Sequence, residues 1–207
     1  MTMTVQHIET IVHGRVLFEK QDPDHLVVGF HGYGETAEIH LAELQRIPGA
    51  GGWSLAAVQA LHPFYSKGGT VIGANWMTSL DRDLAIEDNL NYVRRTLAEL
   101  PSARTVVFLG FSQGAPMAAR AAAHIPAAGL IVLGGDLPPD VRGRNLPPLL
   151  LARGTRDEWY TAEKFREDLK FFQPATTLVF DGGHEWTDEF RTAAGEFLAA
   201  LKRSPSP

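Results

Sequence analysis

Short apolar runs alternate with longer amphipathic segments over most of the chain. An apolar run bounded by turn residues is typical of a buried strand. Strands are therefore predicted at residues 27–30, 55–58, 106–109, 130–133, 149–152 and 177–180. The run at 55–58 is equally compatible with a helical turn, but Gly51-Gly52 before it and His62-Pro63 after it favour a strand.

Segments with apolar residues at helical spacing lie between these runs. The clearest covers residues 81–100, ends before Pro101 and repeats large apolar residues at positions 84, 90, 93 and 97. The other helices are predicted at residues 36–47, 114–123, 161–172 and 185–201. Strands that alternate with helices predict an α/β fold whose mainly parallel sheet is covered on both faces.

Three other segments carry weaker patterns. Residues 10–18, with a turn at His13-Gly14, predict a short antiparallel hairpin at the sheet edge. Residues 61–80 form the longest segment without an assigned element, and residues 203–207 predict a frayed tail. Because no linker or repeat divides the sequence, we expect one domain that spans residues 1–207 and has no stretch free to build a cap.

Composition narrows the class of protein. A chain of 207 residues with 44% hydrophobic content is sufficient for one buried sheet. A net charge of −5 without a basic cluster argues against nucleic acid as a partner. No signal-peptide pattern is found and no apolar run approaches the roughly 20 residues of a membrane helix, so a cytoplasmic location is expected. The absence of cysteine excludes disulfides and a cysteine nucleophile, and no motif predicts a metal site.

The sequence GFSQG at residues 110–114 directly follows an apolar run and opens an alanine-rich segment. This strand, turn and helix setting is what the GxSxG nucleophile elbow requires, because its glycines let strand and helix approach around a strained serine. Since GxSxG also occurs by chance, the pattern needs support from elsewhere in the chain. It makes Ser112 the candidate nucleophile.

Hydrolases built on this elbow place an acid and then a histidine after the serine. His124 falls in the helix that Ser112 begins, so His184, on a loop after a predicted strand, is the candidate base. Asp157, which follows the apolar run 149–152, is the preferred acid. Asp136 follows the preceding strand and is the alternative.

An HGYG turn at residues 31–34 follows the first predicted parallel strand. In hydrolases such a loop supplies one backbone amide of the oxyanion hole, and the residue after the nucleophile supplies the other. The candidates are Tyr33 and Gln113. We expect His31 to hold the loop by hydrogen bonds instead of taking part in the chemistry.

Taken in order, these motifs resemble the phospholipase/carboxylesterase family of small α/β-hydrolases, which includes bacterial carboxylesterases and acyl-protein thioesterases. The similar segments extend over most of the chain and read HGYGE, GFSQGA, LGGDLP, GTRDEW and GGHEW. The resemblance implies an α/β-hydrolase fold and hydrolysis of a small-molecule ester or thioester of short to medium acyl length, without a cofactor. It leaves open whether the chain forms a homodimer.

The resemblance also suggests where substrate binds, and it breaks down in two places. Candidate substrate contacts are Gly32, Trp76, Leu137 and Trp159. Met77 and Thr78 replace the aromatic residue and the acid that follow the family's tryptophan, and the usual Asp-x-x-Val-Pro of the acid loop reads DEWYT at residues 157–161. These departures bear on the expected substrate preference and leave the expected fold unchanged.

Overall fold

The computed structural model describes residues 2–172 and 174–203, and within these residues seven strands form the main sheet. Its strand order is β1-β3-β2-β6-β7-β8-β9. Only β1 runs antiparallel to its neighbour in this sheet, and the other neighbouring pairs are parallel. The strands are β1 (Arg15–Glu19), β2 (His25–Phe30), β3 (Ser54–Gln59), β6 (Thr105–Phe111), β7 (Gly129–Leu133), β8 (Leu149–Gly154) and β9 (Ala175–Phe180).

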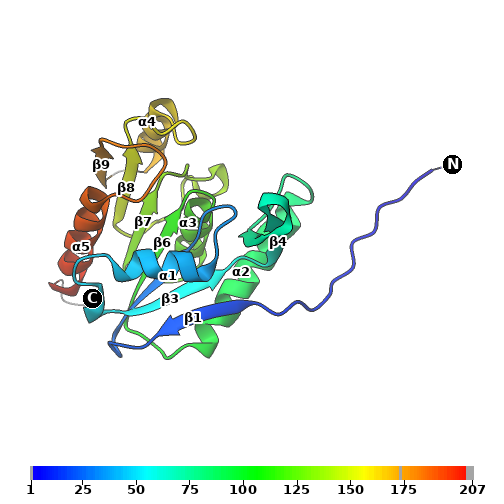
Figure 1. The fold of residues 1–207 in the computed structure, drawn as a ribbon, viewed down its shortest axis with the longest axis horizontal. Helices are drawn as coiled ribbons and strands as arrows, with labels where there is room; N and C mark the ends of the chain where they lie inside the picture. Colours follow the sequence, from blue (N-terminus) through cyan, green and yellow to red (C-terminus); the bar gives the residue numbers. More distant parts are fainter. Residues whose placement is uncertain (1, 173, 204–207) are drawn as a thin grey trace.

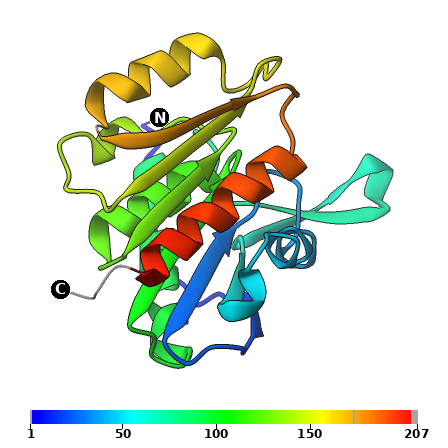
Figure 2. The same cartoon turned by 90° about the vertical axis from the view of Figure 1, so that its left-hand side faces the viewer.

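Helices cover both faces of this sheet (Figures 1 and 2). The alternation of side chains along each strand separates two apolar cores; on β2, for example, Val27 points to one core and Val28 to the other. One core is closed by α1 (Ala37–Gln45) and α5 (Asp188–Arg203). The other is closed by α2 (Arg82–Glu99), α3 (Gly114–His124) and α4 (Ala162–Phe171). The predicted α/β architecture is confirmed.

The order in which the chain adds strands to the sheet changes side at β2. The chain passes from β2 to β3 on one side and then crosses to β6 on the other, from which it continues outward to β9. In open parallel sheets, a ligand site forms at the carboxyl ends of the strands where this change of side occurs. The loops after β2 and β6 are therefore neighbours at the expected position of a site.

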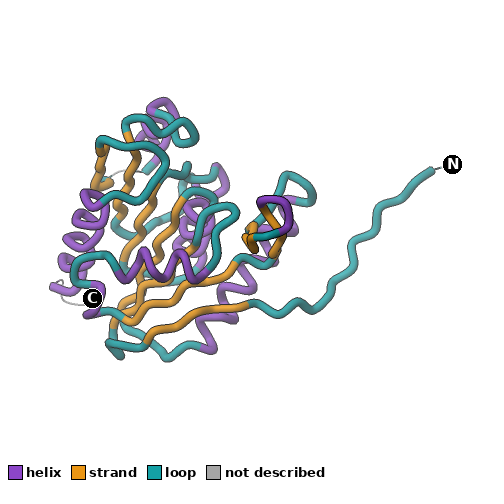
Figure 3. Tube along the Cα trace, viewed as in Figure 1, coloured by secondary structure: helices purple, strands orange, loops and turns teal. Residues whose placement is uncertain are grey.

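The predicted hairpin at residues 10–18 is wrong. Residues 2–14 have no regular secondary structure, and β1 pairs with β3 instead (Figure 3). The hydroxyl of Tyr92, on α2, accepts from the Arg15 amide at 2.9 Å and donates to the Arg15 carbonyl at 2.7 Å. The Tyr92 hydroxyl thus takes up the amide and the carbonyl of Arg15, with which a preceding strand would have to pair. Gly14 lies so close to the Tyr92 ring that a Cβ there would be 1.9 Å from Cε2.

The segment at residues 61–80, which carried no prediction, contains a hairpin of β4 (His62–Ser66) and β5 (Val71–Asn75). It projects from the body of the protein (Figures 1 and 2). Its base is bound to the HGYG loop, because Gly34 donates to the Ala74 carbonyl at 2.9 Å and Ala74 donates to the Glu35 carbonyl at 3.0 Å. At Gly73 a Cβ would be 2.5 Å from the Gly34 oxygen, so only glycine fits this contact.

The carboxyl-terminal prediction is partly wrong. Arg203 ends α5 instead of belonging to a tail, and the predicted tail at 204–207 lies outside the described residues. Among the helices of the described chain, none combines the length and the apolar character needed to cross a bilayer.

One histidine is buried on the inner face of α1. His40 is 1% exposed, and neither ring nitrogen has a hydrogen-bond partner among the described residues. Burial, with a smaller effect of His31, lowers the pKa of His40 to about 3. A histidine in an unfolded chain titrates near pH 6.5, so below that pH the unfolded state binds more protons than the folded state. The folded state therefore loses stability as the pH falls from about 6.5 toward the folded pKa.

We expect His40→Phe to remove this part of the acid sensitivity. Phenylalanine keeps a ring against Trp186, whose ring centroid lies 5.5 Å from that of His40, and it cannot bind a proton. Each pH unit between the two pKa values contributes up to about 1.4 kcal/mol. Between pH 7 and pH 5 the free energy of unfolding should thus fall about 2 kcal/mol less in the variant than in the wild type.

Urea unfolding at the two pH values measures this difference. His62→Phe, at an exposed position, is the matched control and should keep the wild-type fall. An equal fall in wild type and His40→Phe would show that this buried imidazole does not cause the acid sensitivity.

Candidate active site

Ser112 occupies the sharp turn between β6 and α3. Its φ of 52° lies in the left-handed region, which a residue with a side chain adopts only at a cost. Neither flanking glycine can be replaced unless the neighbouring backbone shifts. A Cβ at Gly110 would be 2.3 Å from the Gly114 oxygen, and one at Gly114 would be 2.0 Å from the Phe30 oxygen. The amide of Ser112 donates to the Leu133 carbonyl on β7 at 2.9 Å, which anchors the turn. The local sequence thus produces the predicted elbow.

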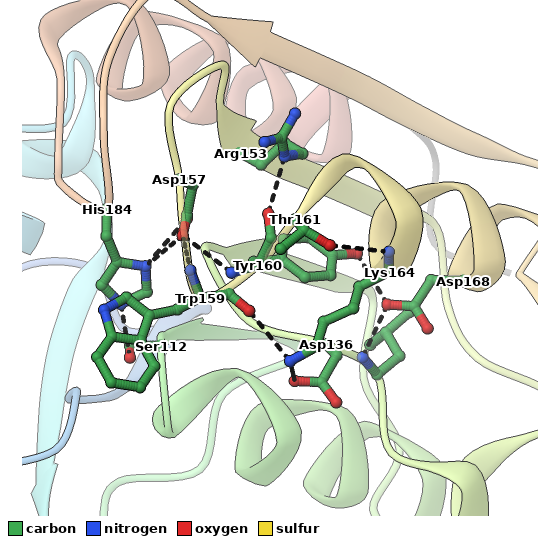
Figure 4. A network of polar contacts seen from close by, with 11 residues as sticks. Ser112, Asp136, Arg153, Asp157, Trp159, Tyr160, Thr161, Lys164, Asp168 and His184 are labelled. Carbon is green, nitrogen blue, oxygen red and sulfur yellow. Dashed lines mark hydrogen bonds and ion pairs between the residues drawn. The ribbon is translucent and has the colours of Figure 1, made fainter.

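Two further loops bring His184 and Asp157 to this serine (Figure 4). The Nε2 atom of His184 lies 2.8 Å from Ser112 Oγ, and its Nδ1 lies 2.9 Å and 3.1 Å from the two carboxylate oxygens of Asp157. The Asp157 side chain is 1% exposed. Its Oδ1 accepts the backbone amides of Trp159 and Tyr160, both at 2.9 Å, so the carboxylate is held from behind while it faces the imidazole.

The alternative acid, Asp136, lies outside this arrangement. Its side chain is 58% exposed, and its carboxylate is 3.9 Å from the Lys164 ammonium group. No hydrogen bond joins it to His184 in the described part of the structure. The geometry therefore unites Ser112 with His184 and Asp157, the acid that the sequence favoured.

The HGYG loop is fixed by an internal set of hydrogen bonds. Ala60 donates to His31 Nε2 at 3.0 Å, so Nδ1 carries the proton and donates to the Gly32 carbonyl at 2.7 Å. Burial lowers the pKa of His31, in keeping with a neutral ring. The indole of Trp76 donates to the His31 carbonyl at 2.9 Å. The expected role of His31, to hold this loop, agrees with these contacts.

Glu35 at the end of the loop binds one of its amides. Its Oε2 accepts from the Gly32 amide at 2.8 Å, and burial raises the pKa of this carboxyl group. Among the described residues, by contrast, no hydrogen bond connects the backbone amide of Tyr33 or of Gln113 to a protein acceptor. These two amides are the ones predicted from sequence to form an oxyanion hole.

The side chain of Gln113 has a role that the sequence did not reveal. Its Oε1 accepts from the Trp76 amide at 3.0 Å, while its Nε2 donates to Asn75 Oδ1 at 2.7 Å and to the Met77 carbonyl at 2.9 Å. The elbow is thereby tied to the chain that leaves β5. No motif in the sequence indicated this contact.

Two predicted substrate contacts are wrong. The Trp76 side chain is 0% exposed and Leu137 is 1% exposed, so neither reaches the surface of the cleft. Both pack in the core that α3 covers. Of the other two, Trp159 is 74% exposed beside Asp157, and Gly32 lies against the elbow, since a Cβ there would be 3.3 Å from the Ser112 Cβ.

A cleft of about 570 Å³ opens on the His184 side of the elbow. Phe111, for which no role was predicted, packs against His184 with ring centroids 5.0 Å apart and an angle of 32° between planes. Glu35 and Trp186 also line the cleft. Over the described residues, no group of histidine, aspartate and glutamate side chains is arranged to hold a metal ion. The site is therefore a polar, open cleft beside a serine, histidine and aspartate chain.

Comparison by sequence found no matching family model and no matching curated protein. Comparison by structure found many similar solved chains. The Bacillus cereus carboxylesterase superposes with a TM-score of 0.73 at 18% identity, covering 91% of this chain and 94% of its own. The Zea mays acyl-protein thioesterase 2 gives 0.74 at 17% identity, with 91% and 99% coverage.

A third solved structure extends the similarity to lipases. The monoacylglycerol lipase of Paleococcus ferrophilus superposes with a TM-score of 0.70 at 16% identity, covering 92% of this chain and 100% of its own. The superpositions with these three structures each cover at least 91% of this chain. The protein therefore has the α/β-hydrolase fold of the carboxylesterase, acyl-protein thioesterase and monoacylglycerol lipase structures.

Proposed function

We propose that this protein is a serine hydrolase that cleaves carboxylic esters, with thioesters as a related substrate, through an acyl-enzyme intermediate. The observation that carries the proposal is the continuous contact from Ser112 Oγ to His184 Nε2 at 2.8 Å and from His184 Nδ1 to Asp157 at 2.9 Å. A nucleophile, a base and an orienting acid in this order are what acyl transfer to water requires.

In the proposed reaction, Ser112 attacks the carbonyl carbon of the ester while His184 accepts its proton. Asp157 keeps the proton of the imidazole on Nδ1, so that Nε2 is free to act as the base, and then stabilises the imidazolium. His184 next donates the proton to the departing alcohol or thiol, which leaves an ester between Ser112 and the acyl group. A water molecule repeats the sequence and releases the acid. No cofactor is needed.

The backbone amides of Tyr33 and Gln113 are proposed to stabilise the negative oxygen of the tetrahedral intermediate. Both lie in loops next to Ser112, and neither has an acceptor within the described chain. Loss of one such donor typically costs about 3 kcal/mol of transition-state stabilisation. The hydrogen bonds of His31 and Gln113 would keep the two loops at a fixed separation before substrate binds.

Short to medium acyl chains are the proposed substrates. Trp76 and Leu137 are buried, so neither side chain lines an open channel for a long acyl chain. The Trp159 side chain is exposed beside the acid and is proposed to contact substrate at the mouth, together with Gly32 in the oxyanion loop. We expect the protein to act in the cytoplasm as one domain.

A panel of p-nitrophenyl esters and acyl-CoA thioesters of increasing chain length tests this proposal on purified protein. The alternative chemistries, hydrolysis of peptides or lactones, use the same residues and should be included as further substrates. A non-catalytic binding module would give no turnover on any of them and no covalent label from a fluorophosphonate probe. Turnover of short esters together with labelling of Ser112 is the expected result.

The open cleft leads to a prediction about lipid aggregates. A lipase with a mobile lid gains rate when its substrate forms an interface, because the interface stabilises the open state. Within the described residues from β1 to α5, consecutive strands, α-helices and 3-10 helices are joined by connections of at most seven residues, so we expect no such lid. The rate with one medium-chain ester should rise smoothly through its critical micelle concentration. A sharp increase at that concentration would mean that part of the chain acts as a lid.

A further inference from the structure

The acid loop differs from the usual family pattern at residues 158–161, and one of these residues is buried. Tyr160 is 0% exposed and points into the protein toward α4. Its hydroxyl donates to Oδ2 of Asp168 at 2.8 Å (Figure 4). Burial, together with the neighbouring Asp168 carboxyl group, raises the pKa of Tyr160, in keeping with a phenol that keeps its proton and donates it.

Asp168 is itself a buried carboxyl group with an unusual set of partners. It is 2% exposed, and its Oδ2 also accepts from the Leu137 amide at 3.0 Å. Among the described residues no cation forms an ion pair with it, and burial raises its pKa. A buried carboxyl group without a cation costs free energy, and a purely structural core would be expected to hold an apolar side chain here. The two hydrogen bonds join the acid loop to the chain that follows β7.

Both segments joined in this way touch the reacting groups. At Gly134, which follows β7, a Cβ would be 3.2 Å from the His184 ring and 3.3 Å from Asp157 Oδ2. In the acid loop, the Tyr160 amide donates to Asp157 Oδ1 at 2.9 Å, and the Tyr160 carbonyl accepts from Arg153 Nε at 2.8 Å. Tyr160 is therefore held through its hydroxyl, its amide and its carbonyl, and the amide is bound to the proposed catalytic acid.

We infer that Tyr160 and Asp168 form a positioning pair for Asp157. The bond between their side chains fixes the backbone of Tyr160, whose amide then holds Asp157 Oδ1 and leaves Oδ2 directed at His184 Nδ1. The inference rests on the proposed function, since it concerns how well Asp157 supports the base. If the pair were absent, the Tyr160 amide would hold Oδ1 less firmly and the Trp159 amide would remain as its other donor, so the geometry needed for proton transfer would be populated less often.

The test compares Tyr160→Phe with Tyr92→Phe. Each variant loses one partly or fully buried phenol hydroxyl and its hydrogen bonds, but Tyr92 bonds to Arg15 at the far edge of the sheet. We expect both to lower the melting temperature, while only Tyr160→Phe lowers kcat, roughly tenfold, with little change in KM. Equal kcat values in the two variants would overturn the inference.

A second comparison uses the partner carboxyl group. Asp168→Asn keeps an oxygen that can accept from Tyr160 and Leu137, so it should retain most of the wild-type kcat, whereas Asp168→Ala should behave like Tyr160→Phe. A kcat equally low in both Asp168 variants would mean that charge, not the hydrogen bond, matters, and would contradict the inference. Asp136→Asn, at an exposed position, is the matched control.

The downfield proton resonance of His184 Nδ1 provides a readout that does not depend on turnover. His184 Nδ1 donates this proton to the Asp157 carboxylate, so loosening the carboxylate should move the resonance upfield in Tyr160→Phe but not in Tyr92→Phe. An unchanged resonance would overturn the inference even if no ester were cleaved. Conversely, absence of wild-type turnover with a shifted resonance would reject the proposed function and leave the positioning role standing.

Discussion

Ser112→Ala is expected to lower kcat for ester hydrolysis by about 10⁵-fold or more, because the covalent step loses its nucleophile. Residual turnover would come from substrate binding and the two loop amides alone. The hydroxyl makes no hydrogen bond in the described chain apart from the one to His184, so the fold should remain intact. Initial rates with p-nitrophenyl butyrate and labelling by a fluorophosphonate probe measure the effect.

His184→Ala should lose nearly as much activity as Ser112→Ala, and the double variant should lose little more. Residues that act as one unit show such non-additive losses, because removal of either member already stops the shared step. Thermal melts by circular dichroism would verify that each variant folds. Activity of Ser112→Ala close to the wild-type level would reject the assignment of the nucleophile.

The second large effect is expected for Asp157→Asn, with a fall in kcat of about 10⁴-fold. The amides of Trp159 and Tyr160 both donate to Asp157 Oδ1, so an asparagine would place its oxygen there. Its NH₂ group would then face His184 Nδ1 and force the ring proton onto Nε2. In that tautomer the imidazole cannot accept the proton of Ser112, although the shape of the site is unchanged.

Asp136→Asn makes the same chemical change on the neighbouring loop and is the control for this prediction. Its carboxylate contacts Lys164 and not the imidazole, so activity within about twofold of wild type is expected. A large loss in Asp136→Asn together with full activity in Asp157→Asn would assign the acid to the other strand. Rates at saturating and at low substrate separate an effect on kcat from one on KM.

The parallel strands and the positions of Ser112 and His184 could be predicted from sequence because each depends on local chemistry. An apolar run fixes a strand, and carboxyl ends of parallel strands meet at one edge of a sheet, so the loops that follow them are brought together. The choice between Asp157 and Asp136 could only be weighted, since both follow strands. In the folded protein it is Asp157 that lies 2.9 Å from His184 Nδ1.

Predictions that depended on contacts between distant segments were less successful. Trp76 was predicted to contact substrate, but its indole donates to the His31 carbonyl, 45 positions away in the sequence, and the ring lies inside the protein. The hairpin of β4 and β5 was missed because its strands are short and mixed in polarity. The glycines at its turn, Gly68 and Gly69, both with positive φ, were the available signal.

Because the β4–β5 hairpin is attached to the HGYG loop at its base, its base and its tip should differ in how well they tolerate substitutions and insertions. Its base, at Gly73 and Ala74, supports the HGYG loop, so insertions or bulky residues there should lower activity on every substrate alike. Its tip, at Gly68 and Gly69, has open space around each glycine Cβ position. Loops of varied length grafted at the tip should therefore be tolerated without disturbing the HGYG loop. The hairpin is thus a natural starting point for directed evolution of this scaffold.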